Sequence, residues 1–336
     1  MNVVYSASDL YSALAGISLT SLLENNKEES EIHVIIMDNG ISEENKRKLT
    51  ETARKYHRDI RFIPLAESLS SVHINIQKWN ISTFGRLFEA SSLPDTDKVI
   101  HVDCDMIVCG SLRELWELDM SHAMIAGAPD CLSDIYKTNI GLKPEDIYIN
   151  AGLLVMNLER IRKTNMEERF LKYIEKNSGF LTYVDQEVLN ACVEKEEKIF
   201  LPLRYNSYSI LHYLTYQQLK RLRHVRHMFP EDEYTQSVEH PAIIHYTGCF
   251  LEGTRPWIEG DSHPLKAEFE KYKKISEWKD MPVWQDTRSG KQKLVTKMSN
   301  TLPKGLVTSG IGVIHGVIVP KMNRAKQKKR RTDHGR

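Results

Sequence analysis

The strongest constraint on the fold is a regular alternation of short apolar runs with amphipathic segments. Apolar runs typical of buried strands cover residues 2–7, 32–37 and 60–63. Segments with apolar residues at helical spacing, 11–23 and 42–56, separate these runs. Strands that alternate with helices form βαβ units, whose strands lie parallel in one sheet. The sequence therefore predicts an α/β protein with a mostly parallel sheet.

The same alternation continues to about residue 278. We expect a helix near 83–91, strands at 98–102, 123–128 and 151–158, helices at 166–176 and 184–194, strands near 198–203 and at 242–245, and a helix at 263–274. Residues 207–236, rich in Tyr, Leu, Arg and His, stay unassigned. We place a domain boundary after residue 278, because the composition changes there into a basic extension, residues 279–336.

Charge is distributed unevenly along the 336 residues. Residues 288–336 carry 13 Lys/Arg and the single acid Asp333, a net charge of +12. This leaves 33 Lys/Arg and 44 Asp/Glu, a net charge of −11, for residues 1–287. An acidic body and a tail without interleaved aromatic residues argue against nucleic-acid binding.

The tail contains one apolar stretch, residues 305–319, with four glycines. It is shorter than the ~20 residues of a spanning helix, and glycines weaken a helix, so we do not expect it to cross a membrane. An apolar segment flanked by basic clusters favours attachment to an anionic membrane surface, and a disordered tail is the alternative.

The cellular compartment is predicted from the first residues and from the cysteines. No basic and apolar signal segment opens the chain. Five cysteines without C-x-x-C spacing argue for reduced thiols, without disulfides or a zinc site. We therefore expect a cytoplasmic protein, peripheral on the inner face of the plasma membrane.

Two carboxylates mark the end of one predicted strand. Asp103 and Asp105 follow the apolar run 99–102, and residues i and i+2 of an extended chain project to one side. Such a pair can share a hard cation at the carboxyl edge of an α/β sheet. A second triplet, Asp95-Thr96-Asp97, follows a proline, and we expect it to be a solvated turn.

His245 ends another predicted strand and could complete a metal site with the two carboxylates. Two carboxylates and one imidazole suit Mn²⁺, with Mg²⁺ as the alternative ion. A histidine that follows a strand is more often an ordinary hydrogen-bonded residue, so the residues alone leave both interpretations open.

Seven short motifs follow one another along roughly residues 1–270. They are Val4-Tyr5-Ser6-Ala7-Ser8-Asp9-Leu10-Tyr11, Ser82-Thr83-Phe84-Gly85-Arg86-Leu87, His101-Val102-Asp103-Cys104-Asp105, Ala126-Gly127-Ala128-Pro129-Asp130, Ile149-Asn150-Ala151-Gly152-Leu153-Leu154-Val155-Met156-Asn157-Leu158, Asp185-Gln186-Glu187-Val188-Leu189-Asn190, and His245-Tyr246-Thr247-Gly248 with Arg255-Pro256-Trp257 behind it. Together they resemble glycosyltransferase family 8, which contains bacterial lipopolysaccharide galactosyl- and glucosyltransferases and glycogenin.

The resemblance implies a GT-A fold, a nucleotide-binding α/β domain that uses Mn²⁺ and a UDP-sugar and retains the anomeric configuration. By the same resemblance, Asp103, Asp105 and His245 are the metal ligands. The donor contacts that it implies are Ala7, Ser8, Asp9 and Tyr11 near the base, and Arg86, Asp103, Asp130, Asn150, Gly248 and Arg255 at the diphosphate and sugar.

Gln186 and Asp185 are the catalytic residues that the resemblance implies. A neutral amide is a poor nucleophile. Either Gln186 only stabilises the anomeric centre during front-face attack, or Asp185 is the nucleophile of a double displacement. The sequence leaves both mechanisms open.

Three features depart from the family pattern. Arg255-Pro256-Trp257 stands where relatives have Lys-Pro-Trp, and arginine keeps the positive charge. Ser8, followed by Asp9, stands where relatives carry an acidic residue that reads uracil. Six residues, 249–254, separate Gly248 from Arg255, where two are usual.

From the motifs as a whole we expect a retaining hexosyltransferase that acts on a glycan or lipid-linked saccharide. The alternative is a non-catalytic UDP-sugar-binding or scaffold protein of the same fold.

Overall fold

The computed structural model describes residues 1–68, 81–177, 180–248, 251 and 254–334. Its centre is a seven-stranded sheet with the order β3-β2-β1-β4-β7-β6-β8. The strands are β1 (Asn2–Ser8), β2 (His33–Asn39), β3 (Ile60–Pro64), β4 (Lys98–Val102), β6 (Ile125–Pro129), β7 (Ile149–Asn157) and β8 (Lys198–Phe200). Only β7 runs antiparallel to its neighbours β4 and β6, so the prediction of a mostly parallel sheet is confirmed.

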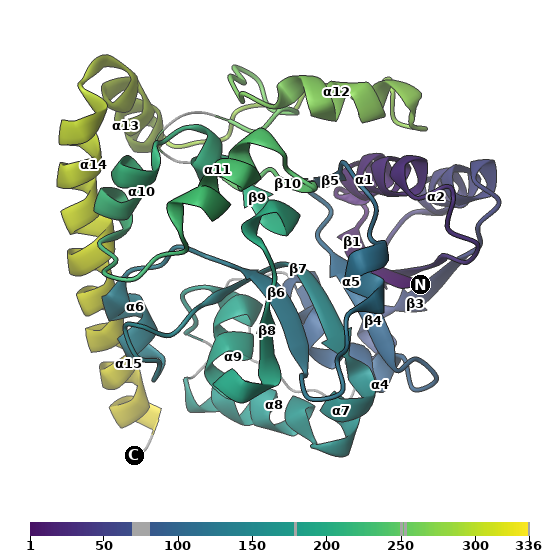
Figure 1. The fold of residues 1–336 in the computed structure, drawn as a ribbon, viewed down its shortest axis with the longest axis horizontal. Helices are drawn as coiled ribbons and strands as arrows, with labels where there is room; N and C mark the ends of the chain where they lie inside the picture. Colours follow the sequence, from purple (N-terminus) through teal and green to yellow (C-terminus); the bar gives the residue numbers. More distant parts are fainter. Residues whose placement is uncertain (69–80, 178–179, 249–250, 252–253, 335–336) are drawn as a thin grey trace.

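Helices cover both faces of this sheet (Figure 1). The helices between the strands are α1 (Ser12–Asn25), α2 (Glu43–Lys55), α3 (Leu65–Ser68), α4 (Glu89–Ser92), α5 (Arg113–Glu117), α6 (Asp134–Asn139), α7 (Leu158–Lys163), α8 (Met166–Lys176) and α9 (Val184–Cys192). The helix predicted near 83–91 is a 3-10 helix, η1 (Ile81–Phe88), that continues into α4. Short 3-10 segments η2 (Lys195–Glu197), η3 (Leu203–Asn206) and η4 (Ser209–His212) follow α9.

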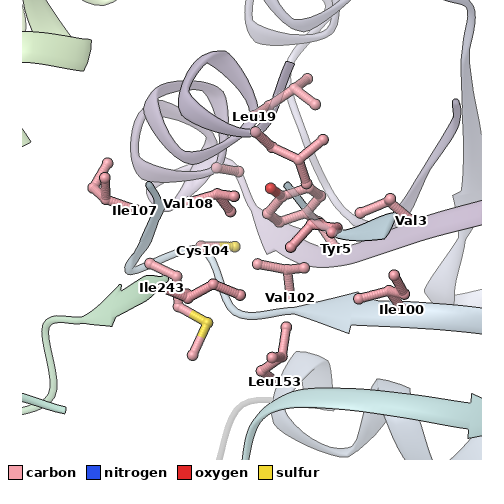
Figure 2. Close-up of a cluster of buried hydrophobic side chains, with 14 of the residues drawn as sticks. Val3, Tyr5, Leu19, Ile100, Val102, Cys104, Ile107, Val108, Leu153 and Ile243 are labelled. Carbon is pink, nitrogen blue, oxygen red and sulfur yellow. The ribbon is translucent and has the colours of Figure 1, made fainter. Parts of the chain in front are cut away.

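Alternate residues of each central strand point into two separate cores. Val3 and Tyr5 of β1 pack under α1, whereas Val4 packs on the opposite face with η1, α8 and α9. Figure 2 shows the first core, in which the Tyr5 ring lies between Leu19 of α1 and Val102 of β4, and Leu153 lies beyond Val102. Burial on both faces explains why these strands are continuous apolar runs in the sequence.

A second, three-stranded sheet has the order β5-β10-β9, formed by β5 (Met106–Val108), β10 (Ile243–His245) and β9 (Ser207–Tyr208). Only β10 was predicted. The antiparallel pairing of β10 with β5 sets His245 opposite Met106, the residue after Asp105. This register brings His245, at the end of β10, close to Asp105, which precedes β5.

The segment that was left unassigned contains α10 (Tyr216–Arg223) and α11 (Glu231–Glu239), and it is followed by α12 (Lys266–Ile275). The end of the predicted domain is anchored on the sheet, because the Trp278 ring packs directly on Gly16 of α1. A Cβ atom at Gly16 would lie 1.8 Å from that ring, so only glycine fits there.

The tail is helical, which corrects the alternative of a disordered tail. It forms α13 (Gly290–Thr301), then α14 (Lys304–Val313), a π-helical segment η5 (Ile314–Ile318) and α15 (Val319–His334). Figure 1 shows α14, η5 and α15 as one long rod beside α10 and α6, and α13 as a separate helix at the top of this rod. Glycine did not prevent the helix, because Gly312 and Gly316 let it approach α10 closely. A Cβ at Gly312 would lie 2.6 Å from the Arg221 carbonyl oxygen.

Candidate active site

The ends of β4 and β10 meet at one edge of the fold because two backbone hydrogen bonds join them to their neighbours. The Asp103 amide donates to the Gly152 carbonyl at 2.9 Å, which extends the β4–β7 pairing beyond the strand. The Tyr246 amide donates to the Asp105 carbonyl at 2.9 Å. Asp103, Asp105 and His245 therefore lie together although about 140 residues of chain separate them.

These three residues form a compact group of potential metal ligands. One ligand atom from each lies within 4.8 Å of the others. His245 Nε2 lies 3.2 Å from Asp105 Oδ1 and 3.7 Å from Asp103 Oδ2. Two carboxylates and one imidazole nitrogen fit Mn²⁺ or Mg²⁺, with positions left for phosphate or water.

The other nitrogen of His245 has a fixed partner. His245 Nδ1 lies 2.9 Å from Asn206 Oδ1. An amide oxygen only accepts, so Nδ1 carries the proton and the Nε2 lone pair faces the carboxylates. This is the arrangement that orients a metal-binding imidazole. Asn206 lies just before the segment that the sequence left unassigned, residues 207–236, and no sequence signal marked it.

Hydrogen bonds continue from Asn206 across the site. Asn206 Nδ2 donates to Asn150 Oδ1 at 2.8 Å, and Asn150 Nδ2 donates to Asp130 Oδ2 at 3.0 Å. Gln186 Nε2 donates to the same Asp130 oxygen at 3.1 Å, while its Oε1 accepts from the Ala151 amide at 2.9 Å. One amide network thus connects His245, a potential metal ligand, with the predicted catalytic glutamine.

Gly152 is a second residue whose role the sequence did not reveal. A Cβ atom at this position would lie 2.3 Å from Cε1 and 2.6 Å from Nδ1 of His245. Such distances are far below van der Waals contact. The absence of a side chain at Gly152 therefore leaves the space that the imidazole ring occupies.

Arg86 is paired with two carboxylates in the site. Its Nη2 is hydrogen-bonded to Asp103 Oδ1, and its Nε lies 2.7 Å from Asp185 Oδ2. Nη1 donates to the Ala151 carbonyl. Burial opposes ionisation of Asp103, but Arg86 and the neighbouring histidines outweigh it and lower the pKa of this carboxyl. Asp103 is therefore ionised, as a metal ligand must be.

A buried pair lies behind the carboxylates. His101 and Glu89 are fully buried, and His101 Nδ1 is hydrogen-bonded to Glu89 Oε1. Burial alone would lower the pKa of His101, but the charge of Glu89 raises it above its usual value. His101 Nε2 lies 3.7 Å from Asp103 Oδ1, so this imidazole also faces that carboxylate.

Asp185 and Gln186 stand at the first turn of α9. The preceding residue, Val184, has a φ of +49°, a left-handed conformation that is unusual for a β-branched side chain. Burial raises the pKa of Asp185, and the charge of Arg86 opposes this. Asp185 is therefore a buried partner of Arg86, whereas Gln186 reaches the Asp130 carboxylate.

A cavity of about 370 Å³ opens at this point. The predicted site residues among its walls are Arg86, Asp103, Asp130, Asn150, Asp185, Gln186, His245 and Gly248. Arg223 of α10, Tyr183 and Tyr208 also line it and were not predicted. The structure thus gathers most of the predicted site residues around one space.

The four donor contacts predicted near the base lie outside the lining of this cavity. Ala7 is buried at the end of β1, and the Ser8 carbonyl accepts from the Tyr11 amide. Asp9 Oδ1 accepts from the Ser42 amide and from Asn45 Nδ2, both at 2.8 Å, and these bonds lower its pKa. The Tyr11 ring meets Trp284 edge to face. Since β1 pairs with β4, these residues flank the edge that carries Asp103.

Arg255 reaches the metal cluster despite the longer preceding loop. Its Nη2 lies 3.5 Å from Asp105 Oδ2, and its guanidinium lies over the Trp257 ring. Gly248 adjoins this guanidinium. Residues 249–250 and 252–253 of the inserted loop lie outside the described part of the chain.

The chain matches known proteins over most of its length. The model of the family named "Glycosyl transferase family 8" matches residues 2–260. General stress protein A of Bacillus subtilis is 27% identical over 286 residues, which cover 83% of this chain and 94% of that protein. A lipopolysaccharide 1,2-glucosyltransferase of Escherichia coli is 28% identical over 293 residues, 84% of this chain and 80% of that protein.

Solved structures agree with the sequence matches. A crystal structure of an active-site mutant of LgtC is 25% identical, with a TM-score of 0.69, and the match covers 82% of this chain and 96% of that one. The galactosyltransferase LgtC with donor and acceptor sugar analogues has the same TM-score at 24% identity, which supports the fold. The chain therefore belongs to glycosyltransferase family 8 and is a glycosyltransferase with a GT-A fold.

Proposed function

We propose that this protein transfers a hexose from a UDP-sugar to a glycan or glycolipid acceptor, with retention of configuration and with Mn²⁺ held by Asp103, Asp105 and His245. The observation that carries the proposal is the meeting of these ligands at one end of a cavity that also contains Arg86 and Gln186. Mg²⁺ is the alternative ion. When bound, the ion would stabilise negative charge on the departing diphosphate.

The chain's own residues supply further charge for the diphosphate. Arg255 lies next to Asp105 and is half-exposed, so its guanidinium can turn to phosphate oxygens with a bidentate fork. Gly248 lets the phosphates approach the backbone closely. Arg86 is held by Asp103 and Asp185, and we assign to it the positive charge next to the donor sugar.

The geometry favours front-face attack over double displacement. The Asp185 carboxylate is only 8% exposed and is paired with Arg86, so it is poorly placed as a nucleophile. Gln186 is held by Asp130 and by the Ala151 amide. We assign to it the stabilisation of the anomeric centre, and to Asp130 and Asn150 contacts with the sugar hydroxyls.

The base of the donor would lie beside β1 and the start of α1. Tyr11 can offer its ring to the uracil, and Ala7 and Ser8 lie next to it at the end of β1. The Asp9 carboxylate already accepts hydrogen bonds from Ser42 and Asn45 at the start of α2. Backbone groups of the turn between β1 and α1 are therefore left as the donors and acceptors for the base.

The membrane part of the proposal concerns the tail. We divide the chain into a catalytic domain, residues 1–278, and a membrane-attachment extension, residues 279–336. One helix, Lys304–Gln327, is long and apolar enough to cross a membrane by length and composition, and 28% of its most apolar window is buried in the structure. Its apolar side chains that face away from the body are Leu306, Val313, Ile314, Ile318 and Met322.

These side chains and the flanking basic residues fit the surface of an anionic bilayer. We therefore propose that the protein acts at the cytoplasmic face of the membrane on a lipid-linked saccharide. The Escherichia coli relative carries the name of a lipopolysaccharide transferase, which supports an acceptor of this kind.

Thermal shift with a panel of UDP-, GDP- and ADP-sugars, each with Mn²⁺ or with a chelator, tests the donor and the metal. A ligand at about 100 times its dissociation constant adds roughly 2.7 kcal/mol to the free energy of unfolding. We expect stabilisation by one UDP-sugar, and only in the presence of Mn²⁺. Donor hydrolysis and transfer are then measured with that sugar.

Two variants sharpen this experiment. Asp105→Asn should abolish both the Mn²⁺-dependent shift and turnover. Asp95→Asn, in the exposed turn of the second Asp-x-Asp triplet, should match the wild type in both. Stabilisation by a UDP-sugar that is equal with Mn²⁺ and with chelator would refute the metal site, and donor binding without any turnover would refute the transfer reaction.

A further inference from the structure

Arg223, the last residue of α10, contributes an unused positive charge to the active-site cavity. It lines the cavity together with Asp130, Tyr183 and Tyr208. Its Nε atom is shielded from solvent and lacks a hydrogen-bond acceptor within the described residues. In the same part of the chain, no carboxylate lies within ion-pair distance of its guanidinium.

The other guanidinium of the cavity behaves differently. Arg86 is compensated by Asp103 and Asp185, and both of its terminal nitrogens have acceptors. Asp130 Oδ2 is already used by Asn150 and Gln186. The Nε–H group of Arg223 is shielded from solvent without an acceptor, which is unfavourable, and an arginine in this state is pre-set for an oxyanion that is absent from the protein itself.

The position of Arg223 separates it from the donor diphosphate. Its electrostatic neighbours are Asp130, Tyr183, Tyr208 and Cys131, whereas the metal cluster adjoins Arg255. Asp130 is connected to His245 through Asn150 and Asn206, and within the described residues no ion pair joins Arg223 to Asp103 or Asp105. We therefore take the oxyanion that Arg223 awaits to be a group other than the donor diphosphate.

Surrounding residues make this corner of an acidic protein positive. Residues 220–226 contain Lys220, Arg221, Arg223 and Arg226 without any acid. Lys220 and Arg221 suit the negative end of the α10 dipole and line an outer groove against the tail helix. Arg223 alone of these residues lines the inner cavity. The outer groove also contains Asp134, whose Oδ2 lies 3.8 Å from the Nε atom of Arg226 and offsets part of this charge.

We propose that Arg223 binds a phosphate group of the acceptor saccharide, so that this transferase selects a phosphorylated acceptor. The inference rests on the proposed function, because it takes the cavity as the place of transfer. The phosphate can be a substituent of the glycan or part of the diphosphate that links a saccharide to lipid, and both present the same oxyanion to the guanidinium.

Binding of a hexose 6-phosphate and of the neutral methyl hexoside to protein in chelator tests the site without any turnover. We expect the wild type to bind the phosphate ester more tightly than the neutral sugar, by about 10- to 100-fold, the range for a charge-assisted hydrogen-bonded pair. Arg223→Gln should erase this preference, and Arg223→Lys should keep part of it. Arg221→Gln changes a residue of α10 that lies two positions before Arg223 and outside the cavity, and this variant should match the wild type.

Equal binding of the phosphate ester by Arg223→Gln and the wild type would overturn the proposal, as would a wild type that does not prefer the ester. A prenyl-diphosphate hexose in detergent distinguishes the two sources of phosphate. Arg223-dependent binding of only this compound assigns the phosphate to the lipid linker, and binding of the simple ester as well assigns it to the glycan. Because no UDP-sugar or Mn²⁺ is present, failure here is distinct from failure of the donor assignment.

Discussion

Asn206 accepts a hydrogen bond from His245, with Oδ1 and Nδ1 2.9 Å apart, and so turns Nε2 of the imidazole toward Asp103 and Asp105. Both side chains are buried, so the ring has little freedom to turn away. The proposed metal site thus depends on a residue that would not itself touch the ion.

Asn206→Ala should weaken Mn²⁺ binding. Loss of a partner that orients a metal-binding histidine typically lowers metal affinity by about 10- to 100-fold. Isothermal titration with Mn²⁺ measures this directly. Asn26→Ala is the matched control, because Asn26 is also buried and holds backbone groups, yet lies away from the cavity. It should lose stability and keep its Mn²⁺ affinity, and the same affinity in Asn206→Ala would mean that packing alone fixes the ring.

Gly152→Ala should displace His245 from the carboxylates. The new methyl group would lie 2.3 Å from the ring, and packing forbids that approach. Overpacking of a core typically costs about 1–3 kcal/mol, so the fold should survive. The Mn²⁺-dependent rise in Tm should disappear in Gly152→Ala. It should persist in Gly110→Ala, where a Cβ would meet no atom within 4 Å. An unchanged Mn²⁺ response in Gly152→Ala would disprove the tight fit.

Much of this site follows from the sequence, because its most important signal is local. An apolar run followed by two acids at i and i+2 fixes the strand β4, its end and the carboxylates. The residues that join these acids in the site are brought there by strand pairings that leave little trace in the sequence. β5 and β9 are three and two residues long, too short for a periodic pattern, yet they set His245 and Asn206 in place.

The tail escaped prediction for a different reason. Helix propensity counts each glycine as a loss, so the sequence predicted membrane attachment, with a disordered tail as the alternative, and did not predict the tail helices. In the fold, Gly312 and Gly316 are the residues that allow α14 and η5 to contact α10, so tertiary packing overrides the local preference. The environment of Arg223 is equally non-local, since its cavity walls come from segments that are far apart in the sequence, such as residues 83–86, 150–152 and 245–248.

Two buried histidines should make the protein sensitive to acid. Burial lowers the pKa of His212 to about 4 and that of His263 to about 3. His263 Nδ1 already accepts from the Leu265 amide and Nε2 contacts Ser209, so the neutral ring is the one that fits. In the unfolded chain both imidazoles have a pKa of about 6.5.

The unfolded state therefore binds more protons than the folded state below pH 6.5, and stability is complete above that pH and falls as the pH drops. Between pH 7 and pH 5 the two histidines should lower the free energy of unfolding by on the order of 3 kcal/mol. Denaturant titrations at both pH values measure the loss. His263→Gln should reduce it by about half, whereas His122→Gln, in an exposed turn, should leave it unchanged. An equal loss in both variants would refute the assignment.

Replacing the outward apolar side chains of the tail should release the protein from anionic membranes. Ile314 and Ile318 are 48% and 46% exposed, and their spacing of four places them on one stripe of the helix, opposite the glycines that face α10. Ile314→Glu with Ile318→Glu adds two negative charges where the bilayer surface would be, so both the apolar and the electrostatic attraction are lost. Flotation with phosphatidylglycerol vesicles measures the binding.

Val283→Glu is the control. It changes an apolar side chain that is 62% exposed but lies before the tail helices, and this variant should bind vesicles like the wild type. Because the substituted side chains point away from the cavity, turnover of a soluble acceptor should remain near the wild-type rate, and vesicle binding that survives in the double variant would show that this stripe is not the membrane contact.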